Sequence, residues 1–242
     1  MRILAASDFH EKKPVYLKKI IKIYKPDIIV SSGDFCQGDW FIRPKGKKNA
    51  HFKKAAIKTK STLKYLDSFN IPIYIVLGNH DVSKTHYDFS TYSKHLDINK
   101  FIKTLKNVKI IHNKKIKLGQ FTLVGYNYIF REKRSPDYKK NLTALMKKQK
   151  NTILFTHDVP YGCKLDIIRN KKSPYNGKHV GDKYLLWAIK KYSPILNICG
   201  HMHENQGKCK IGKTLVVNPG FGQNGEAAII DLPKLKIKFI KL

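Results

Sequence analysis

Residues 71–81 read Ile-Pro-Ile-Tyr-Ile-Val-Leu-Gly-Asn-His-Asp. The apolar run 71–77 is short and rich in β-branched residues, which is typical of a buried strand. It is followed at once by Gly78-Asn79-His80-Asp81, whose side chains carry an amide, an imidazole and a carboxylate. In sheets of parallel strands, ligands gather at the carboxyl ends of the strands. This stretch therefore predicts a buried strand that ends in a polar site.

The same arrangement occurs at four other places in the chain. In each case a short apolar run precedes a motif containing Asp or His. Apolar runs without alternation indicate strands that are buried on both faces, with helices outside. We expect all five motifs to meet at one edge of such a sheet. The four motifs are Asp8-Phe9-His10 after residues 2–6, Gly33-Asp34 after 27–30, Thr156-His157 after 152–155, and Gly200-His201-Met202-His203 after 195–198.

The donors in these motifs fit a site that holds two divalent metal ions. Alternation along a strand would place Asp8 and His10 on one side, and likewise His201 and His203. Asp34 has two carboxylate oxygens and could bridge two ions. Such dinuclear sites mostly cleave phosphate esters. The candidate metal ligands are Asp8, His10, Asp34, Asn79, His157, His201 and His203.

Three further residues are candidates for catalysis or substrate binding. His80 could donate a proton or stabilise a phosphoryl oxygen. Asp81 could orient the His80 ring through its second nitrogen. Asn79 and His80 could also contact the substrate. His179 stands just before an expected helix, where it could face the substrate or serve the capping loop.

The rest of the chain alternates helix-like and strand-like segments. A β-α-β-α-β first half is followed by a second half richer in strands, with loops at residues 126–137 and 159–179 that could overhang the site. We expect residues 1–242 to form one α/β domain. Helices are expected at residues 14–24, 49–69, 94–105, 137–148 and 181–192, further strands at 108–112, 115–118 and 121–126, and strands with turns over 207–242.

The chain is strongly basic, with 48 Lys and Arg against 17 Asp and Glu and a formal net charge of +31. A basic face gathers polyanions such as nucleic acid. However, only five of the basic residues are Arg, the side chain that favours bidentate readout of phosphate or guanine. Generic basicity is therefore the preferred interpretation. If a polyanion is bound, residues 43–64 are the first candidate.

The cysteines and the apolar segments bear on location. The four cysteines form no CxxC pair and no dense framework, so we interpret them as free thiols rather than disulfides or a zinc site. No apolar stretch is long enough for a transmembrane helix. The short segment before the first motif does not have the form of a secretory signal. These features predict a cytoplasmic protein with no membrane partner.

In their order, the five motifs resemble the signature of the calcineurin-like metallophosphoesterase superfamily: D-x-H, G-D, G-N-H-[D/E], H and G-H-x-H. The resemblance runs from Asp8 to His203. The tail is similar to that of small prokaryotic members, which carry a Pro-containing loop after the lone His and an Asn-Pro-Gly turn. Those are residues 158–162 and 218–220 here.

The resemblance implies a four-layer α/β/β/α sandwich, with two central mixed β-sheets and flanking helices, as one metallophosphoesterase domain. It implies that His80 assists the leaving group. One departure is Glu11, where the family often has Gly, and this carboxylate is expected near the mouth of the site. The resemblance also implies one ion on Asp8, His10, Asp34 and His203, and a second on Asp34, Asn79, His157 and His201.

The expected function is hydrolysis of phosphodiesters or phosphomonoesters by a metal-bridged hydroxide at a dinuclear site. Mn²⁺ is the first choice of ion, with Fe, Zn²⁺ or Ni²⁺ as alternatives. The absence of an obvious large cap favours small substrates such as nucleotides or cyclic nucleotides. One alternative is a nuclease that binds DNA or RNA through the basic surface. Another is a non-catalytic nucleic-acid-binding or scaffold protein on the same fold. A homo-oligomer is possible in each case.

Overall fold

The structure is a computed structural model that describes residues 1–36, 48–81, 94–126 and 138–242. Two segments singled out from the sequence lie partly outside these residues. They are the start of the lysine-rich stretch, residues 43–47, and the expected loop at 127–137.

The first sheet has the order β12-β11-β1-β2-β3-β4. Its strands β1 to β4 are parallel, and β11 and β12 add an antiparallel edge. The carboxyl ends of the four parallel strands therefore point to one edge of the sheet. The strands are β1 (Arg2–Ala5), β2 (Ile28–Ser31), β3 (Ile73–Ile75), β4 (Val108–Ile110), β11 (Glu226–Asp231) and β12 (Lys236–Lys241).

The second sheet has the order β5-β6-β7-β8-β10-β9. Strands β6, β7, β8 and β10 are parallel, and the two outer strands pair antiparallel. Its strands are β5 (Lys114–Leu118), β6 (Phe121–Gly125), β7 (Thr152–Phe155), β8 (Leu196–Ile198), β9 (Gly207–Ile211) and β10 (Thr214–Asn218).

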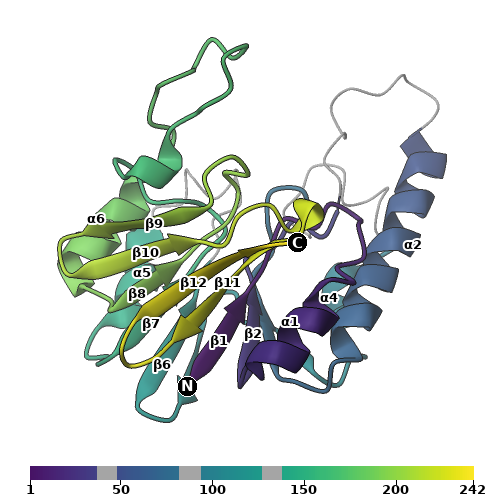
Figure 1. Ribbon diagram of the computed structural model, residues 1–242, viewed down its shortest axis with the longest axis horizontal. Helices are drawn as coiled ribbons and strands as arrows, with labels where there is room; N and C mark the ends of the chain where they lie inside the picture. The colour runs from purple at the N-terminus through teal and green to yellow at the C-terminus, as the bar shows by residue number, and fades with distance from the viewer. Residues whose placement is uncertain (37–47, 82–93, 127–137) are drawn as a thin grey trace.

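Helices cover the outer face of each sheet, which gives four layers (Figure 1). Helix α6 begins where the Asp182 carboxylate accepts hydrogen bonds from the Tyr184 and Leu185 amides. The first sheet is covered by α1 (Leu17–Tyr24), α2 (Lys48–Asp67) and α4 (Ile98–Ile102), and the second by α5 (Tyr138–Met146) and α6 (Lys183–Tyr192); two short 3₁₀ turns are η3 (Lys164–Asp166) and η4 (Gly222–Asn224).

The buried apolar side chains form three clusters, one between each pair of adjacent layers. Alternation in β1 sends Leu4 to the cluster beneath α1, α2 and α4, whereas its neighbour Ile3 packs between the two sheets. The third cluster joins the second sheet to Leu142 of α5 and Leu185 of α6. Because each sheet is covered on both faces, its parallel strands can be apolar throughout.

The four-layer fold with two mixed sheets, predicted from the sequence, is confirmed. The helices are shorter than expected, most clearly α4, which spans Ile98–Ile102 where residues 94–105 were predicted. All four cysteines are free thiols, as the sequence indicated. Among the described residues, no helix is both long and apolar enough to span a membrane.

Candidate metal centre

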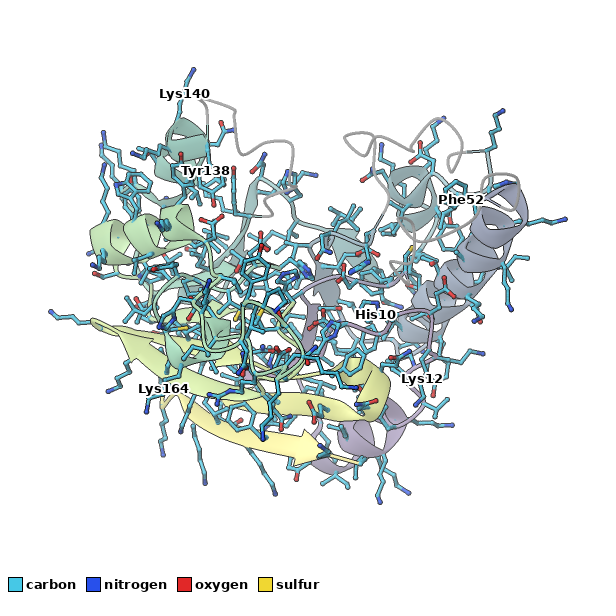
Figure 2. All side chains as sticks on the ribbon, turned by 90° about the horizontal axis from the view of Figure 1, so that it is seen from above. His10, Lys12, Phe52, Tyr138, Lys140 and Lys164 are labelled. Atoms are coloured by element: carbon cyan, nitrogen blue, oxygen red, sulfur yellow. The ribbon has the colours of Figure 1, made fainter. Side chains whose placement is uncertain are left out.

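The five motifs lie in loops that follow five parallel strands. Asp8 comes three residues after β1, Asp34 three after β2 and Asn79 four after β3. In the second sheet, His157 lies two residues after β7 and His201 three after β8. Seen from above, His10 lies between Phe52 of α2 on one side and Tyr138 of α5 on the other (Figure 2). The loops thus meet between the two halves of the molecule.

The backbone of these loops is turned rather than extended. Asp8, His10, Asp34 and His201 have φ values of 60°, 43°, 55° and 68°. These angles belong to the left-handed region, which non-glycine residues seldom occupy. The prediction that strand alternation aligns Asp8 with His10, and His201 with His203, was therefore wrong. The side chains converge because the chain turns after each strand has ended.

The first two loops are held side by side by main-chain hydrogen bonds. The Asp8 amide donates to the Gly33 carbonyl at 2.9 Å, and the His10 amide to the Asp34 carbonyl at 3.0 Å. A Cβ at Gly78 would overlap the Asp34 carboxylate, and one at Gly200 would lie 2.7 Å from Asp8 Oδ2. Glycine at these two positions lets the neighbouring loops approach the carboxylates closely.

The first donor group consists of Asp8, His10, Asp34 and His203, whose ligand atoms all lie within 4.8 Å of one another. The Nε2 atoms of His10 and His203 are 3.1 Å apart. His203 Nε2 also lies 3.3 Å from Asp8 Oδ1. Two imidazole nitrogens and two carboxylates thus face one small volume.

The second donor group consists of Asp34, His157 and His201, with the Asn79 amide oxygen beside them. His157 Nδ1 lies 2.6 Å from the Ser32 carbonyl oxygen, which can only accept, so Nδ1 carries the proton. In the neutral ring, Nε2 then presents a lone pair. It faces the Asn79 oxygen at 2.7 Å and His201 Nδ1 at 3.2 Å. These three donor atoms lie close enough together to bind one cation.

Asp34 belongs to both groups. Its Oδ1 accepts a hydrogen bond from the His80 amide at 2.8 Å, whereas its buried Oδ2 has no hydrogen-bond partner in the described part of the chain. Oδ2 lies 3.4 Å from His157 Nε2 and 4.0 Å from His10 Nε2. Burial, together with the charges of Asp8 and Asp81, raises the pKa of Asp34 well above its usual range. Cations beside Oδ2 would offset that effect.

His10 and His157 are poised as neutral donors. Burial lowers the pKa of His10 to about 4 and that of His157 to about 3. Burial alone would raise the pKa of Asp8, but the hydrogen bond from His203, the closeness of His157 and the hydrogen bond from Ser7 bring it down to about 2. At neutral pH, two imidazole lone pairs and an ionised carboxylate are therefore available without the loss of a proton.

His80 lies at the same centre. Its Nε2 is 3.8 Å from Asp34 Oδ2, and its ring contacts the His10 ring edge-on at 5.1 Å. Burial is the main reason that the pKa of His80 falls to about 4, with the neighbouring histidines adding to it. Its ring is half-buried at the side of the two donor groups, a position from which it can reach a bound substrate.

Asp81 has a different setting from the one predicted. Its buried carboxylate accepts hydrogen bonds from the amides of Asp34 (2.8 Å), Phe35 (2.8 Å), Cys36 (3.1 Å) and Gly78 (2.9 Å). Burial raises the pKa of Asp81 to about 6, and these amides oppose the rise. The carboxylate thus fixes the loop of Asp34 against its own loop, a structural position rather than one beside the His80 ring.

Phe221 is part of the centre and was missed by the sequence analysis. Its ring stacks on His203 at 4.2 Å with a 6° interplanar angle, and meets His10 edge-on at 5.6 Å. It follows the Asn218-Pro219-Gly220 turn, in which Asn218 Nδ2 donates to the Met202 carbonyl at 2.9 Å. A single aromatic residue does not form a recognisable motif. The only sign of its role in the sequence was its position directly after the Asn-Pro-Gly turn.

Two candidate residues lie outside both donor groups. His179 Nδ1 lies 2.6 Å from a carboxylate oxygen of Asp166, which is fully buried. Glu11 is not at the mouth as expected: its side chain is 5% exposed and pairs with Lys58 of α2 at 3.3 Å. The Glu11 carboxylate is therefore buried against the helix layer.

The donor set fits two divalent cations that share Asp34. It consists of imidazole nitrogens, carboxylate oxygens and one amide oxygen, without a thiolate. Such ligands suit Mn²⁺, Fe or Zn²⁺. Two adjoining donor groups at the carboxyl ends of the strands are what a two-metal hydrolase needs.

Comparison with known proteins gives the family. The family model described as calcineurin-like phosphoesterase matches residues 1–205. The chain therefore belongs to the calcineurin-like phosphoesterases and is a phosphoric ester hydrolase, which confirms both expectations drawn from its motifs.

Individual relatives support the fold. An uncharacterized protein of Methanocaldococcus jannaschii is 26% identical over 221 residues, which cover 90% of this chain and 88% of that protein. The crystal structure of TT1561 from Thermus thermophilus has a TM-score of 0.67 at 18% identity, over 99% of this chain and 98% of that one. A dimetal phosphatase from Danio rerio has a TM-score of 0.58 at 11% identity, over 100% and 98%.

Proposed function

We propose that this protein hydrolyses phosphodiester or phosphomonoester bonds in small substrates, such as nucleotides or cyclic nucleotides, at a dinuclear metal site. The observation that carries the proposal is the position of Asp34 Oδ2, buried without a hydrogen-bond partner in the described structure and lying between the histidines of the two donor groups. A carboxylate oxygen in such a place suits a bridge between two ions.

In this proposal the donor groups each hold one ion, with Mn²⁺ as the first choice. Asp8, His10, Asp34 and His203 would hold the first. Asp34, Asn79, His157 and His201 would hold the second. When bound, two such ions bind phosphoryl oxygens as Lewis acids and make water a nucleophile at neutral pH.

The other residues of the centre position and stabilise. We assign to His80 a hydrogen bond from its neutral ring to the leaving or phosphoryl oxygen, supported by its lowered pKa and its place beside both donor groups. Asp81 keeps the Asp34 loop in register through its four amide hydrogen bonds. Phe221 keeps the His203 ring in one plane.

Chelation and metal analysis test this function. Purified protein should contain about two ions per chain and cleave bis-p-nitrophenyl phosphate. EDTA should abolish turnover, and added Mn²⁺ should restore it. Turnover indifferent to EDTA would contradict a metal-dependent reaction. A metal-free protein that binds nucleic acid without cleaving any phosphoester would favour the scaffold alternative.

A further inference from the structure

Arg169 stands out among the arginines that the structure describes. The other one, Arg2, pairs with Asp231 at 2.6 Å and donates to the Tyr24 carbonyl at 2.7 Å. The Nε of Arg169 donates to Asn205 Oδ1 at 2.7 Å, and its two terminal nitrogens make no hydrogen bond within the described residues. One edge of the guanidinium is thus fixed, while the fork that can bind an oxyanion is available.

The group that fixes Arg169 is itself firmly held. Asn205 is 4% exposed, and its Nδ2 donates to the carbonyl oxygens of Leu165 at 3.0 Å and Ile167 at 2.7 Å. The main-chain amide of Asn205 donates to the Met202 carbonyl at 3.1 Å. Asn205 therefore joins the loop of Arg169 to the turn that carries His203, two residues away.

Arg169 belongs to an ordered hairpin, residues 167–179, which we call the arm. A bridge joins Ile167 to His179, and the Ile168 amide donates to the Lys178 carbonyl at 3.1 Å. The arm rises above the edge of the sheets at which the parallel strands end (Figure 1). At its base, buried Asp166 contacts His179 and accepts hydrogen bonds from the Gly162 and Gly181 amides.

The charge of the arm is entirely positive. Its sequence contains Arg169, Lys171, Lys172 and Lys178 and no Asp or Glu. The adjacent carboxylate, Glu204, accepts from the main-chain amide of Arg169 at 3.4 Å, and no ion pair joins the two side chains in the described structure. An anion that approaches this fork meets no carboxylate from the arm itself.

We propose that Arg169 is a specificity residue that binds a second phosphate group of the substrate, next to the one being hydrolysed. This inference rests on the proposed function. A dinuclear centre holds one phosphoryl group, so a neighbouring phosphate needs a cation of its own. The planar fork of Arg binds two phosphate oxygens at once, which a Lys cannot do. The favoured substrates therefore carry two phosphates, either as a diphosphate or as adjoining phosphates of a short oligonucleotide.

The test compares substrates with one and with two phosphates. Bis-p-nitrophenyl phosphate has one phosphate, and a dinucleoside diphosphate has two that are joined directly. A dinucleotide, tested with and without a 5′-phosphate, shows whether the second phosphate can be the neighbouring phosphate of an oligonucleotide. Arg169→Gln should raise KM for the two-phosphate substrates by roughly 10- to 100-fold, the range for a hydrogen bond to a charged group. It should leave kcat/KM for bis-p-nitrophenyl phosphate within about twofold.

Matched variants separate the fork from general charge. Arg169→Lys should recover only part of the loss, and Lys171→Gln, which removes one charge from the same arm, should change KM little. The rise in KM caused by Arg169→Gln is compared between the dinucleoside diphosphate and the 5′-phosphorylated dinucleotide. The substrate with the larger rise shows which kind of second phosphate Arg169 binds. An equal loss on bis-p-nitrophenyl phosphate, or an equal effect of Lys171→Gln, would overturn the proposal.

Binding provides a readout that does not depend on turnover. Metal-loaded wild-type protein should bind inorganic pyrophosphate more tightly than inorganic phosphate, and Arg169→Gln should remove that preference. A preference that survives in Arg169→Gln rejects the role of Arg169, even when the enzyme is active. Loss of the preference in a protein without turnover supports the second-phosphate site and rejects the proposed function instead.

Discussion

The two donor groups share Asp34 but differ in how firmly the protein holds them. In the second group, the His157 side chain is 1% exposed and its ring is fixed by the Ser32 carbonyl. In the first group, the His203 side chain is 34% exposed, and its ring contacts Asp8 at 3.3 Å and stacks on Phe221. His157 is thus enclosed and oriented by a hydrogen bond, whereas His203 is partly open to solvent beside an aromatic ring.

This difference indicates a division of labour. A ligand whose ring is fixed through its second nitrogen keeps its orientation and its basicity. We expect the ion of the second group to be retained and the ion of the first to exchange more readily. Asn205, which accepts a hydrogen bond from Arg169, lies two residues after His203. We therefore expect substrate to arrive on the side of His203.

The largest effect is expected at Asp34, the carboxylate that both donor groups share. Asp34→Asn should lower kcat for bis-p-nitrophenyl phosphate by at least roughly 10²- to 10³-fold, because an amide cannot bridge two ions or offset their charge. Both ions should be lost together in metal analysis. The matched control is Asp231→Asn, the same substitution at the exposed pair with Arg2. Full activity in metal-loaded Asp34→Asn would rule out a shared bridging ligand.

A smaller and unequal effect should separate the groups. His157→Ala and His203→Ala should each lower the affinity for one ion by at least roughly 10- to 100-fold, the loss caused by removing a partner of a metal ligand. Calorimetric titration with Mn²⁺ should show two binding steps in the wild-type protein. His157→Ala should lose affinity in the tighter step, and His203→Ala in the weaker step. Loss of the same step in both variants would contradict the difference between the groups.

The smallest effect should come from Phe221. Phe221→Ala removes the ring stacked on His203, and such contacts contribute about 0.5–1.5 kcal/mol. We expect the affinity for the weaker ion to fall by roughly 2- to 10-fold while the tighter step stays unchanged. Phe221→Tyr, which keeps the ring, is the control. A change in the tighter step would contradict the assignment of Phe221 to the first donor group.

The sequence was sufficient for the order of the elements and for the set of converging donors. Apolar runs report burial directly, and the Gly-containing motifs mark where chains approach closely. It failed on backbone detail: alternation does not apply to Asp8 and His10, because left-handed turns follow the end of β1. It also could not show that Asp81 faces four amides rather than His80, since both lie within the same motif.

Residues that act through tertiary contact were beyond the reach of the sequence. Phe221 and Asn205 are ordinary residues in the sequence and acquire their roles from His203 and Arg169, which lie far away along the chain or on another loop. Glu11 was noticed for its unusual identity, but its partner Lys58 belongs to a helix 47 positions later. Pairings of this kind depend on packing between layers, which local patterns do not encode.

The left-handed backbone at Asp8, His10, Asp34 and His201 has a consequence for the evolution of this chain. Holding a non-glycine residue there is unfavourable by roughly 1–2 kcal/mol at each position. Glycine would relieve that strain and would at the same time delete a donor. A lineage that no longer needed the reaction could become more stable by replacing these residues, so their retention opposes the pull of stability. Asp34 is the clearest case, because its raised pKa shows that the buried carboxylate is unfavourable in the folded protein. Asp34→Gly should accordingly fold at least as well as the native chain when no metal is present.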